Sequence, residues 1–327
     1  MVSQSDRYRA MRVALVIAGC AIASPVAAQE WPSRTVTIVV PLAAGSASDI
    51  AARVVADQLS KQLKATFIVE NRTGAGGTVG AGAVARSAPD GHTILAYGAL
   101  SIAHALYSKL PYDTLNDFIP VIPLGQQAQA ITTAPSKGYK TLGDLIAAGK
   151  AKPGALNYSS AGVGSASHFA AERLMVAAGF TAQHIPFKGS GESLREIIAG
   201  RVDFSIQSFA TTVPLIQNGT LLPLAVSAHK RSALVPNVPT TIEAGLPTES
   251  VYVFYTGIYL PAKTPRSIVE KLHGEIAKAL QSPETQALFK KGGVEPLPMS
   301  LDEFGKFTRE EVASTIALAR AAKIKQQ

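Results

Sequence analysis

The sequence is poor in cysteine and in aromatic residues. Of its 327 residues one is a cysteine and one a tryptophan, and aromatic residues make up 6%. The single cysteine, Cys20, lies in an N-terminal segment that we expect to be removed, so the mature chain would contain none. Disulfides and cysteine-based zinc, iron–sulfur or thiol chemistry are then excluded.

The chain also lacks an apolar run long enough to cross a membrane. Three arginines precede an apolar stretch at residues 13–23, and small residues at 26–28 form a cleavage site. This is the layout of a secretory signal peptide, which we place at residues 1–28. No later segment reaches the roughly 18 apolar residues of a membrane helix. We therefore expect an exported, periplasmic protein. We also expect it to work without a cofactor.

Cys20 leaves a second possibility open for the same segment. Residues 17–20 match the pattern of a lipoprotein signal, in which the cysteine becomes a lipid-bearing first residue. The apolar stretch continues past Cys20 to a good small-residue site, and this favours ordinary cleavage over a lipid anchor. Export follows from either interpretation.

The positive charges are scattered rather than gathered. The formal charge is +8, and the first 28 residues hold three arginines and one aspartate, so +6 remains for the rest. Nucleic-acid binding would require a basic patch with interleaved aromatic residues, and none occurs. A diffuse positive field would instead help to recruit small anions.

Strand-like and helix-like segments alternate along the chain. Residues 36–40 are a β-branched run typical of a parallel sheet, and residues 49–63 follow with helical spacing, with Ser46 or Ser48 as N-cap. The alternation continues to residue 227, with residues 213–218 as part of the series. Further strands are expected at 66–69, 92–97, 129–134, 155–158, 183–186, 202–206 and 222–227, and helices at 78–88, 142–150, 167–178 and 192–199.

This order predicts an α/β protein with two lobes. After a strand at 251–259 the sequence indicates only helices, at 265–281, 283–291 and 301–323, which would return to the first lobe. We place lobe 1 at 29–126 and 255–327, and lobe 2 at 127–254. Proline-rich residues 119–123 and 236–247 would cross between them. Each lobe is expected to be a mostly parallel sheet flanked by helices, with a ligand cleft between the lobes.

Four loops between strand ends and helix starts consist of small residues, at 41–49, 71–78, 159–168 and 187–192. Ligands collect at the carboxyl ends of strands in such sheets. Without bulky side chains, backbone N–H groups and helix N-termini can point at an anion. Glycines that only shape tight turns would explain one such loop better than four. We therefore expect the loops to bind a small carboxylate, which could be a dicarboxylate, a hydroxy-acid or an aromatic carboxylate.

Four side chains near these loops have two interpretations each. Asp49 could oppose the dipole of its helix, the structural role that we favour, or it could fix the glycine loop or accept a bond from a ligand donor. His168 could cap and pack, or belong to the site. Lys188 could bind the ligand or lie in solvent. Tyr255 could face the cleft or pack in a core.

Enzyme motifs are missing. The glycines at 74–79 fail the dinucleotide fingerprint because Val79 occupies the third glycine's place, and there is no Walker loop or G-x-S-x-G motif. The six histidines are far apart in sequence, and none forms a metal-binding pair at helical spacing. An exported hydrolase or isomerase would have to rely on His168 near Ser165. We expect no catalysis and no metal.

Many short motifs, in a specific order and spacing, carry a resemblance to a known family. The sequence resembles the substrate-binding receptors of tripartite tricarboxylate transporters, often called Bug-type receptors, over essentially the whole mature chain. The motifs are WPSR (31–34), PLAAGSASD (41–49), ENR (70–72), GAGG (74–77), APDG (88–91), LPYD (110–113), DF (117–118), PV (120–121), GVGSASH (162–168), PFKG (186–189), AGRVD (199–203), VPT (238–240) and EAG (243–245).

The resemblance implies a two-lobed type II periplasmic binding protein, a monomer, that delivers its ligand to a membrane permease. The carboxylate would be held by backbone groups and waters at the first two loops, with the third loop across the cleft. A sensor for a membrane signalling partner would use the same closure. The residues expected to contact the ligand are Leu42, Ala43, Ala44, Gly45, Ser46, Ala47, Asp49, Gly74, Ala75, Gly76, Gly77, Ser101, Gly162, Val163, Gly164, Ser165, His168, Lys188, Gln207, Ser208 and Tyr255.

Two departures from the family pattern bear on the ligand. Ser46 stands where the first loop usually has the second glycine of a pair, so either a hydroxyl enters the site or the backbone differs. Gln207 and Ser208 stand where many relatives have an Asp-Asn pair. A ligand amine would lack its carboxylate partner, so we expect a dicarboxylate or hydroxy-acid rather than an amino acid.

Overall fold

The structure, a computed structural model, describes residues 31–324 and 326. The chain divides into two compact units, 1–33 and 34–327, and the fold described below is that of the second unit. The expected signal peptide and Cys20 lie outside the described residues. No helix of the described part is long and apolar enough to span a membrane.

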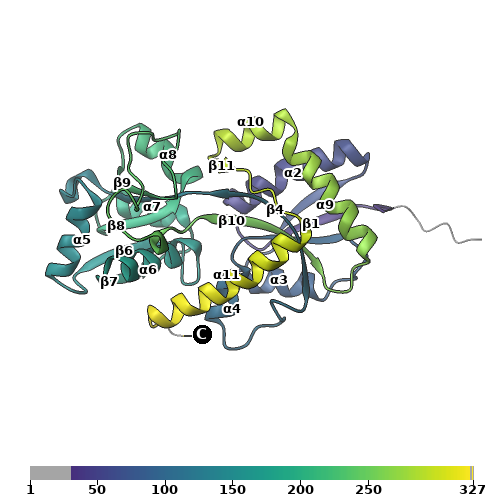
Figure 1. Ribbon diagram of the computed structural model, residues 1–327, viewed down its shortest axis with the longest axis horizontal. Helices are drawn as coiled ribbons and strands as arrows, with labels where there is room; N and C mark the ends of the chain where they lie inside the picture. Colours follow the sequence, from purple (N-terminus) through teal and green to yellow (C-terminus); the bar gives the residue numbers. More distant parts are fainter. Residues whose placement is uncertain (1–30, 325, 327) are drawn as a thin grey trace, which may run out of the picture. The chain divides into compact units, whose positions relative to one another are not determined.

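One mixed sheet contains six strands in the order β11-β4-β10-β3-β1-β2. β1 pairs in parallel with both β2 and β3, whereas β10 runs antiparallel between β3 and β4, and β11 runs antiparallel to β4. Figure 1 shows β4 and β10 running side by side. The strands are β1 (Val36–Val40), β2 (Phe67–Asn71), β3 (Thr93–Tyr97), β4 (Phe118–Gln127), β10 (Phe254–Pro261) and β11 (Val294–Glu295).

A second mixed sheet contains five strands in the order β7-β6-β8-β5-β9. β6 pairs in parallel with β7 and β8, and β5 runs antiparallel to β8 and β9. Only Ala128 separates β4 of the first sheet from β5 of the second. The strands are β5 (Gln129–Thr133), β6 (Leu156–Ser160), β7 (Ala182–Pro186), β8 (Phe204–Ser208) and β9 (Leu222–Ser227).

The α/β class with two helix-flanked sheets is confirmed, but the sheets are mixed rather than mostly parallel. In the first sheet the antiparallel pairings come from β10, β4 and β11, and in the second from β5. Strand–helix alternation predicts only the parallel part, because it does not say where a strand that enters late, such as β10, inserts. Strands β5–β9 lie within residues 127–254, and the division into lobes at these residues stays a prediction.

Ten α-helices surround the two sheets in the described residues, and most begin where the sequence predicts them. Ser46 caps the first, and Thr141 and Ser300 each form a capping box with an acidic residue three positions later. The helices are α2 (Ala47–Leu63), α3 (Thr78–Ala85), α4 (Leu100–Leu106), α5 (Leu142–Ala151), α6 (Ala166–Ala178), α7 (Ser190–Ile198), α8 (Phe209–Gln217), α9 (Arg266–Gln281), α10 (Pro283–Lys291) and α11 (Leu301–Ala321).

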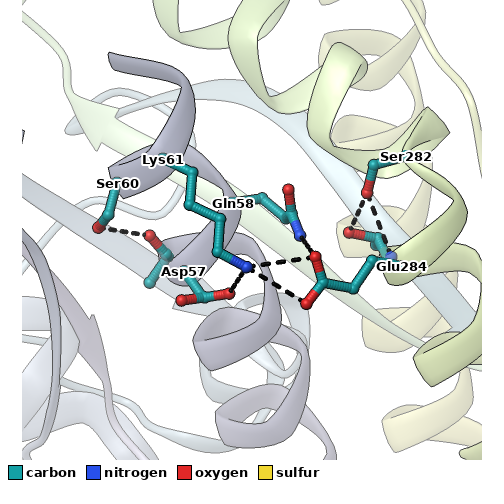
Figure 2. A network of polar contacts seen from close by, with 8 residues as sticks. Asp57, Gln58, Ser60, Lys61, Ser282 and Glu284 are labelled. Carbon is teal, nitrogen blue, oxygen red and sulfur yellow. Dashed lines mark hydrogen bonds and ion pairs between the residues drawn. The ribbon is translucent and has the colours of Figure 1, made fainter. Parts of the chain in front are cut away.

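The C-terminal helices α9 and α11 pack against the first sheet. Helix α9 packs against α2 and β4, and α11 lies along α4 and β4. Figure 2 shows polar contacts between α2 and α10: Glu284 accepts from Gln58 Nε2 at 2.6 Å and from Lys61 Nζ at 3.2 Å, and Lys61 also pairs with Asp57 at 2.7 Å. These contacts tie α10 to the first helix of the fold.

Candidate functional site

The small-residue loops lie at the carboxyl ends of neighbouring parallel strands. In the first sheet β3, β1 and β2 are adjacent, so the loops after β1 and β2 and the start of α4 after β3 share one edge. In the second sheet β7, β6 and β8 are adjacent and bring together the third loop, the fourth loop and the end of β8. The topology therefore groups the loops at two sheet edges, where ligands of open α/β sheets bind.

The first loop is held by the carboxylate of Asp49, a buried residue. Its Oδ2 accepts the N–H of Gly45 at 2.9 Å and Arg53 Nε at 3.1 Å, and its Oδ1 accepts Asn71 Nδ2 at 2.9 Å. Asn71 also donates to the carbonyl of Leu42 at 2.9 Å, which joins the loop to the end of β2. Burial acts to raise the pKa of Asp49, and its hydrogen bonds and Arg53 outweigh it and lower that pKa. Asp49 thus fixes the loop, which is one of the alternatives to the favoured role of opposing the helix dipole.

Ser46 serves as the N-cap of α2. Its backbone is extended, with φ −67° and ψ 159°, and its hydroxyl accepts the N–H of Asp49 at 3.3 Å. Serine suits this position because it needs no positive φ and satisfies one free helical N–H. Within the described residues, the N–H groups of Ala43 and Ala44 have no hydrogen-bond partner, and both residues are exposed.

The second loop depends on positive φ angles at four consecutive residues: Gly74 (133°), Ala75 (44°), Gly76 (62°) and Gly77 (99°). A Cβ on Gly77 would lie 2.5 Å from the hydroxyl of Tyr97, which donates to the carbonyl of Gly76. Residues 74–76 are exposed, and their N–H groups have no partner in the part of the chain that is described. Tyr97, at the end of β3, supports a loop with outward-facing donors.

The third loop uses most of its N–H groups internally. Gly162 donates to Ser160 Oγ at 3.0 Å, and Ser165 donates to the carbonyl of Gly162 at 3.1 Å. Gly164 donates to His168 Nδ1 at 3.3 Å. Val163 is exposed, and its N–H is the one in residues 161–165 that has no partner among the described residues.

His168 lies beneath this loop and is 4% exposed. Its ring stacks on that of His184 with centroids 4.1 Å apart and planes at 6°. Burial lowers the pKa of His168 to about 3, with a further contribution from His184, and burial lowers the pKa of His184 to about 4. Both imidazoles are therefore neutral at pH 7. His168 contacts the loop from the protein interior.

Two further expected residues flank the loops. Lys188 is exposed in the fourth loop, and its N–H donates to Glu192 Oε2 at 3.1 Å. Ser101 is 4% exposed in the first turn of α4.

The side chains of Gln207 and Tyr255 are used in the protein core. Gln207 is buried and donates to Ser193 Oγ at 2.9 Å. The ring of Tyr255 packs edge-on against Phe307 with centroids 5.0 Å apart, because its strand face is covered by α11. Both side chains are therefore held within the core, and their expected contact with the ligand stays a prediction. Ser208 stays at the end of β8 as the N-cap of α8, half-buried.

The third loop also contacts the helix that follows β3. A Cβ on Gly164 would lie 2.7 Å from Cδ1 of Leu106 in α4. The third loop, which follows β6 of the second sheet, therefore lies against α4, the helix that follows β3 of the first sheet. Sequence reasoning missed the supporting residues Tyr97 and His184. The position of Tyr97, directly at a strand end before a glycine, is the signal that could have found it.

Two hollows on the described surface lie away from the loops. One of about 420 Å³ is lined by His104 and Arg320, and another of about 590 Å³ by Lys140 and Glu243. Neither includes a residue expected to contact the ligand. Across residues 31–324 and 326, no group of His, Cys, Asp and Glu is arranged to hold a metal ion.

Comparisons with known proteins agree with the fold. A family model described as the tripartite tricarboxylate transporter family receptor, TctC, matches residues 51–324. Protein BugT of Bordetella pertussis is 32% identical over 318 residues, covering 96% of this chain and 97% of BugT. An R. palustris protein solved with adipate is 30% identical with a TM-score of 0.84, covering 91% of this chain and all of that one.

A second solved relative, MatC from Rhodopseudomonas palustris with bound malate, is 31% identical. Its TM-score is 0.80, and the match covers 88% of this chain and 99% of MatC. The matched family consists of periplasmic solute-binding receptors rather than enzymes. The chain therefore belongs to the receptor family of the tripartite tricarboxylate transporters.

Proposed function

We propose that the protein is a periplasmic receptor that binds a small dicarboxylate or hydroxy-acid and delivers it to a membrane permease of a tripartite transporter. The observation that carries the proposal is the set of exposed N–H groups without partners in two loops at adjacent strand ends. They belong to Ala43 and Ala44 after β1, and to residues 74–76 after β2. Such groups have the polarity and placement to bind a carboxylate.

The number of donors is sufficient for useful affinity. Micromolar binding requires about 8 kcal/mol. A hydrogen bond to a charged group contributes about 1.5–3 kcal/mol. Five backbone donors therefore suffice without an arginine clamp, and the nearby Arg53 and Arg72 are already paired with Asp49 and Glu70.

The preference against amino acids rests on where the acidic groups are. Asp49 could have received a ligand ammonium group, but both of its oxygens already accept hydrogen bonds from the protein. Gln207 is neutral and bonded in the core. The relatives solved with adipate and malate also carry ligands without an amine, which supports a diacid or hydroxy-acid for this chain.

The proposal also covers lobe closure, export and the choice of transport over sensing. The two sheets form two lobes, 29–126 with 255–327 and 127–254, which close on the ligand as a monomer. Residues 1–28 direct export. Transport is preferred to sensing because the matched family is described by its transporter.

The test is a thermal-shift screen of refolded mature protein, free of co-purified ligand. Succinate, adipate, malate and aspartate are compared at equal concentrations. A ligand at a hundred times its Kd stabilises the folded state by about 2.7 kcal/mol. We expect shifts with the diacids or malate and little with aspartate. A shift with aspartate alone, or with none of the acids, contradicts the proposal.

A further inference from the structure

Three near-parallel rings lie under the third loop, each from a different element. Tyr158 of β6 stacks on His184 of β7 with centroids 4.8 Å apart, and His184 stacks on His168 of α6 at 4.1 Å. Tyr158 is fully buried and His168 nearly so. His184 is half-buried. Two histidines packed face to face in this place favour the neutral rings, because a charge there loses part of its hydration and two charges would repel each other.

Both imidazoles connect to backbone groups of the loop. His168 Nδ1 accepts the N–H of Gly164 at 3.3 Å. His184 Nε2 lies 2.6 Å from Ser160 Oγ, which accepts the N–H of Gly162 at 3.0 Å and donates to the carbonyl of Gly162 at 3.1 Å. A serine hydroxyl has one hydrogen and two lone pairs. If His184 donates through Nε2, the one hydrogen and both lone pairs of the Ser160 hydroxyl are all engaged in hydrogen bonds.

We propose that His168 and His184 are positioning residues for the ligand site. Through Gly164 and Ser160 they fix the third loop in the conformation that leaves the N–H of Val163 as its outward donor. The inference rests on the proposed function, since it assigns these residues to the same site. Neither ring contacts the ligand.

The loop geometry depends on the protonation state of the pair. A proton on His168 Nδ1 would face the N–H of Gly164, so that two donors would meet and the contact would break. The titratable groups beside the pair are Tyr158 on β6 and Glu172 on α6. Tyr158 donates to Glu172 Oε1 at 2.6 Å, and that oxygen lies 3.8 Å from His168 Nε2. The opposite ring nitrogen of His168 therefore carries the proton, toward Glu172.

The first experiment compares two substitutions at His168. His168→Asn can keep an acceptor at the position of Nδ1, whereas His168→Leu removes it at similar size. Adipate and malate are titrated calorimetrically, and exchange of the Gly164 amide is followed by NMR without ligand. We expect about tenfold weaker binding and much faster Gly164 exchange for His168→Leu, the cost of one hydrogen bond. Near-normal values are expected for His168→Asn.

Several outcomes overturn the inference. One is unchanged Gly164 exchange in His168→Leu, and another is equal loss of affinity in both variants with normal stability. If neither acid binds the unmodified protein, the proposed function fails, while the amide exchange still tests the positioning role. His273→Ala, on α9, serves as a control for loss of a histidine elsewhere.

A second measurement needs no variant, should His168→Leu not fold. Nitrogen-15 NMR of the imidazole rings in the unmodified protein reports which ring nitrogen is protonated. We expect His168 and His184 both to be neutral at pH 7 with the proton on Nε2. A proton on Nδ1 of His168 contradicts the inference.

Discussion

The buried carboxylate of Asp49 accepts the backbone N–H of Gly45 at 2.9 Å, four residues earlier in the chain. The same side chain receives Asn71 at 2.9 Å from the end of the neighbouring strand. One carboxylate thus ties the first loop to the start of the second. The free N–H groups of Ala43 and Ala44 are held in place because their neighbours are bonded to Asp49 and Asn71.

Replacing Asp49 by alanine is expected to lower both stability and affinity. The change removes the buried acceptor of Gly45 and Asn71. Gly45 is exposed, and the half-buried Asn71 still donates to Leu42, so the expected loss is about 1 kcal/mol of unfolding free energy. Urea unfolding measures this, and calorimetry with adipate should show weaker binding. Asp57→Ala, on the exposed side of the same helix, is the matched control and should change little. Equal effects of the two substitutions would refute this role for Asp49.

Gly77→Ala separates a steric clash from backbone strain. At Gly77 φ is 99° and a Cβ would lie 2.5 Å from Tyr97, whereas at Gly138 φ is 81° and no atom lies within 4 Å. Strain alone costs about 1 kcal/mol, so Gly138→Ala should lose about that much. Gly77→Ala should lose clearly more and weaken adipate binding. Similar unfolding free energies for the two variants would contradict the close packing of the loop on Tyr97.

The stacked histidines predict a loss of stability in acid. The pKa of His168 falls from 6.5 to about 3 on folding, and that of His184 to about 4, mainly through burial. The unfolded chain therefore binds protons that the folded chain does not. Stability is fully present above pH 6.5 and decreases toward pH 4, by up to about 1.4 kcal/mol per pH unit for each histidine.

Urea unfolding at pH 7, 5 and 4 measures this slope. Glu172 and Glu311 act in the opposite direction, because burial raises the pKa of each. A comparison with the double variant His168→Asn, His184→Gln isolates the histidine contribution, since both glutamates remain. The variant should show a shallower acid loss. An identical slope in the two proteins would mean that the pair does not titrate on unfolding.

The contacts in Figure 2 are expected to contribute to stability but not to binding. Glu284→Ala removes the acceptor of Gln58, which is 8% exposed, and a partner of the half-exposed Lys61. The expected loss is about 1 kcal/mol, most of it from Gln58. Adipate affinity should stay unchanged, because Gln58 and Lys61 lie near the C-terminal end of α2, about 14 Å or more along the helix from Asp49. Altered affinity would show that α10 communicates with the loops.

The local pattern of the sequence predicts most strands and helices. The elements that it does not predict, such as β4 and α4, each have a specific physical reason. Residues 36–40 and 222–227 are strands with the expected bounds. The sequence predicts a crossing between lobes at residues 119–123, within β4, because Pro120 and Pro123 are unusual inside a strand. Both prolines lie opposite β10 at the points where the register shifts, so the irregular pairing accommodates them.

Two other segments differ for reasons of context. Residues 213–218 were expected to continue the strand–helix series. Residues 213–217 form the second half of α8, with Asn218 as its C-cap, and the start of α8 at Phe209 follows directly on β8. Helix α4 was missed because its seven residues are nearly all buried and show no polar face. The supporting roles of Tyr97 and His184 require tertiary contacts, which no local pattern contains.

The proposal that the ligand is bound through its carboxylates is tested most directly by comparing an acid with its uncharged analogue. Calorimetric titration of refolded protein with adipate and with adipamide, the diamide of the same length, measures the contribution of the negative charge. Backbone donors at Ala43, Ala44 and residues 74–76 predict binding of adipate, or of malate in a parallel titration, and at least tenfold weaker binding of the diamide. Equal affinity for adipate and adipamide, or no binding of either acid, would contradict a carboxylate receptor.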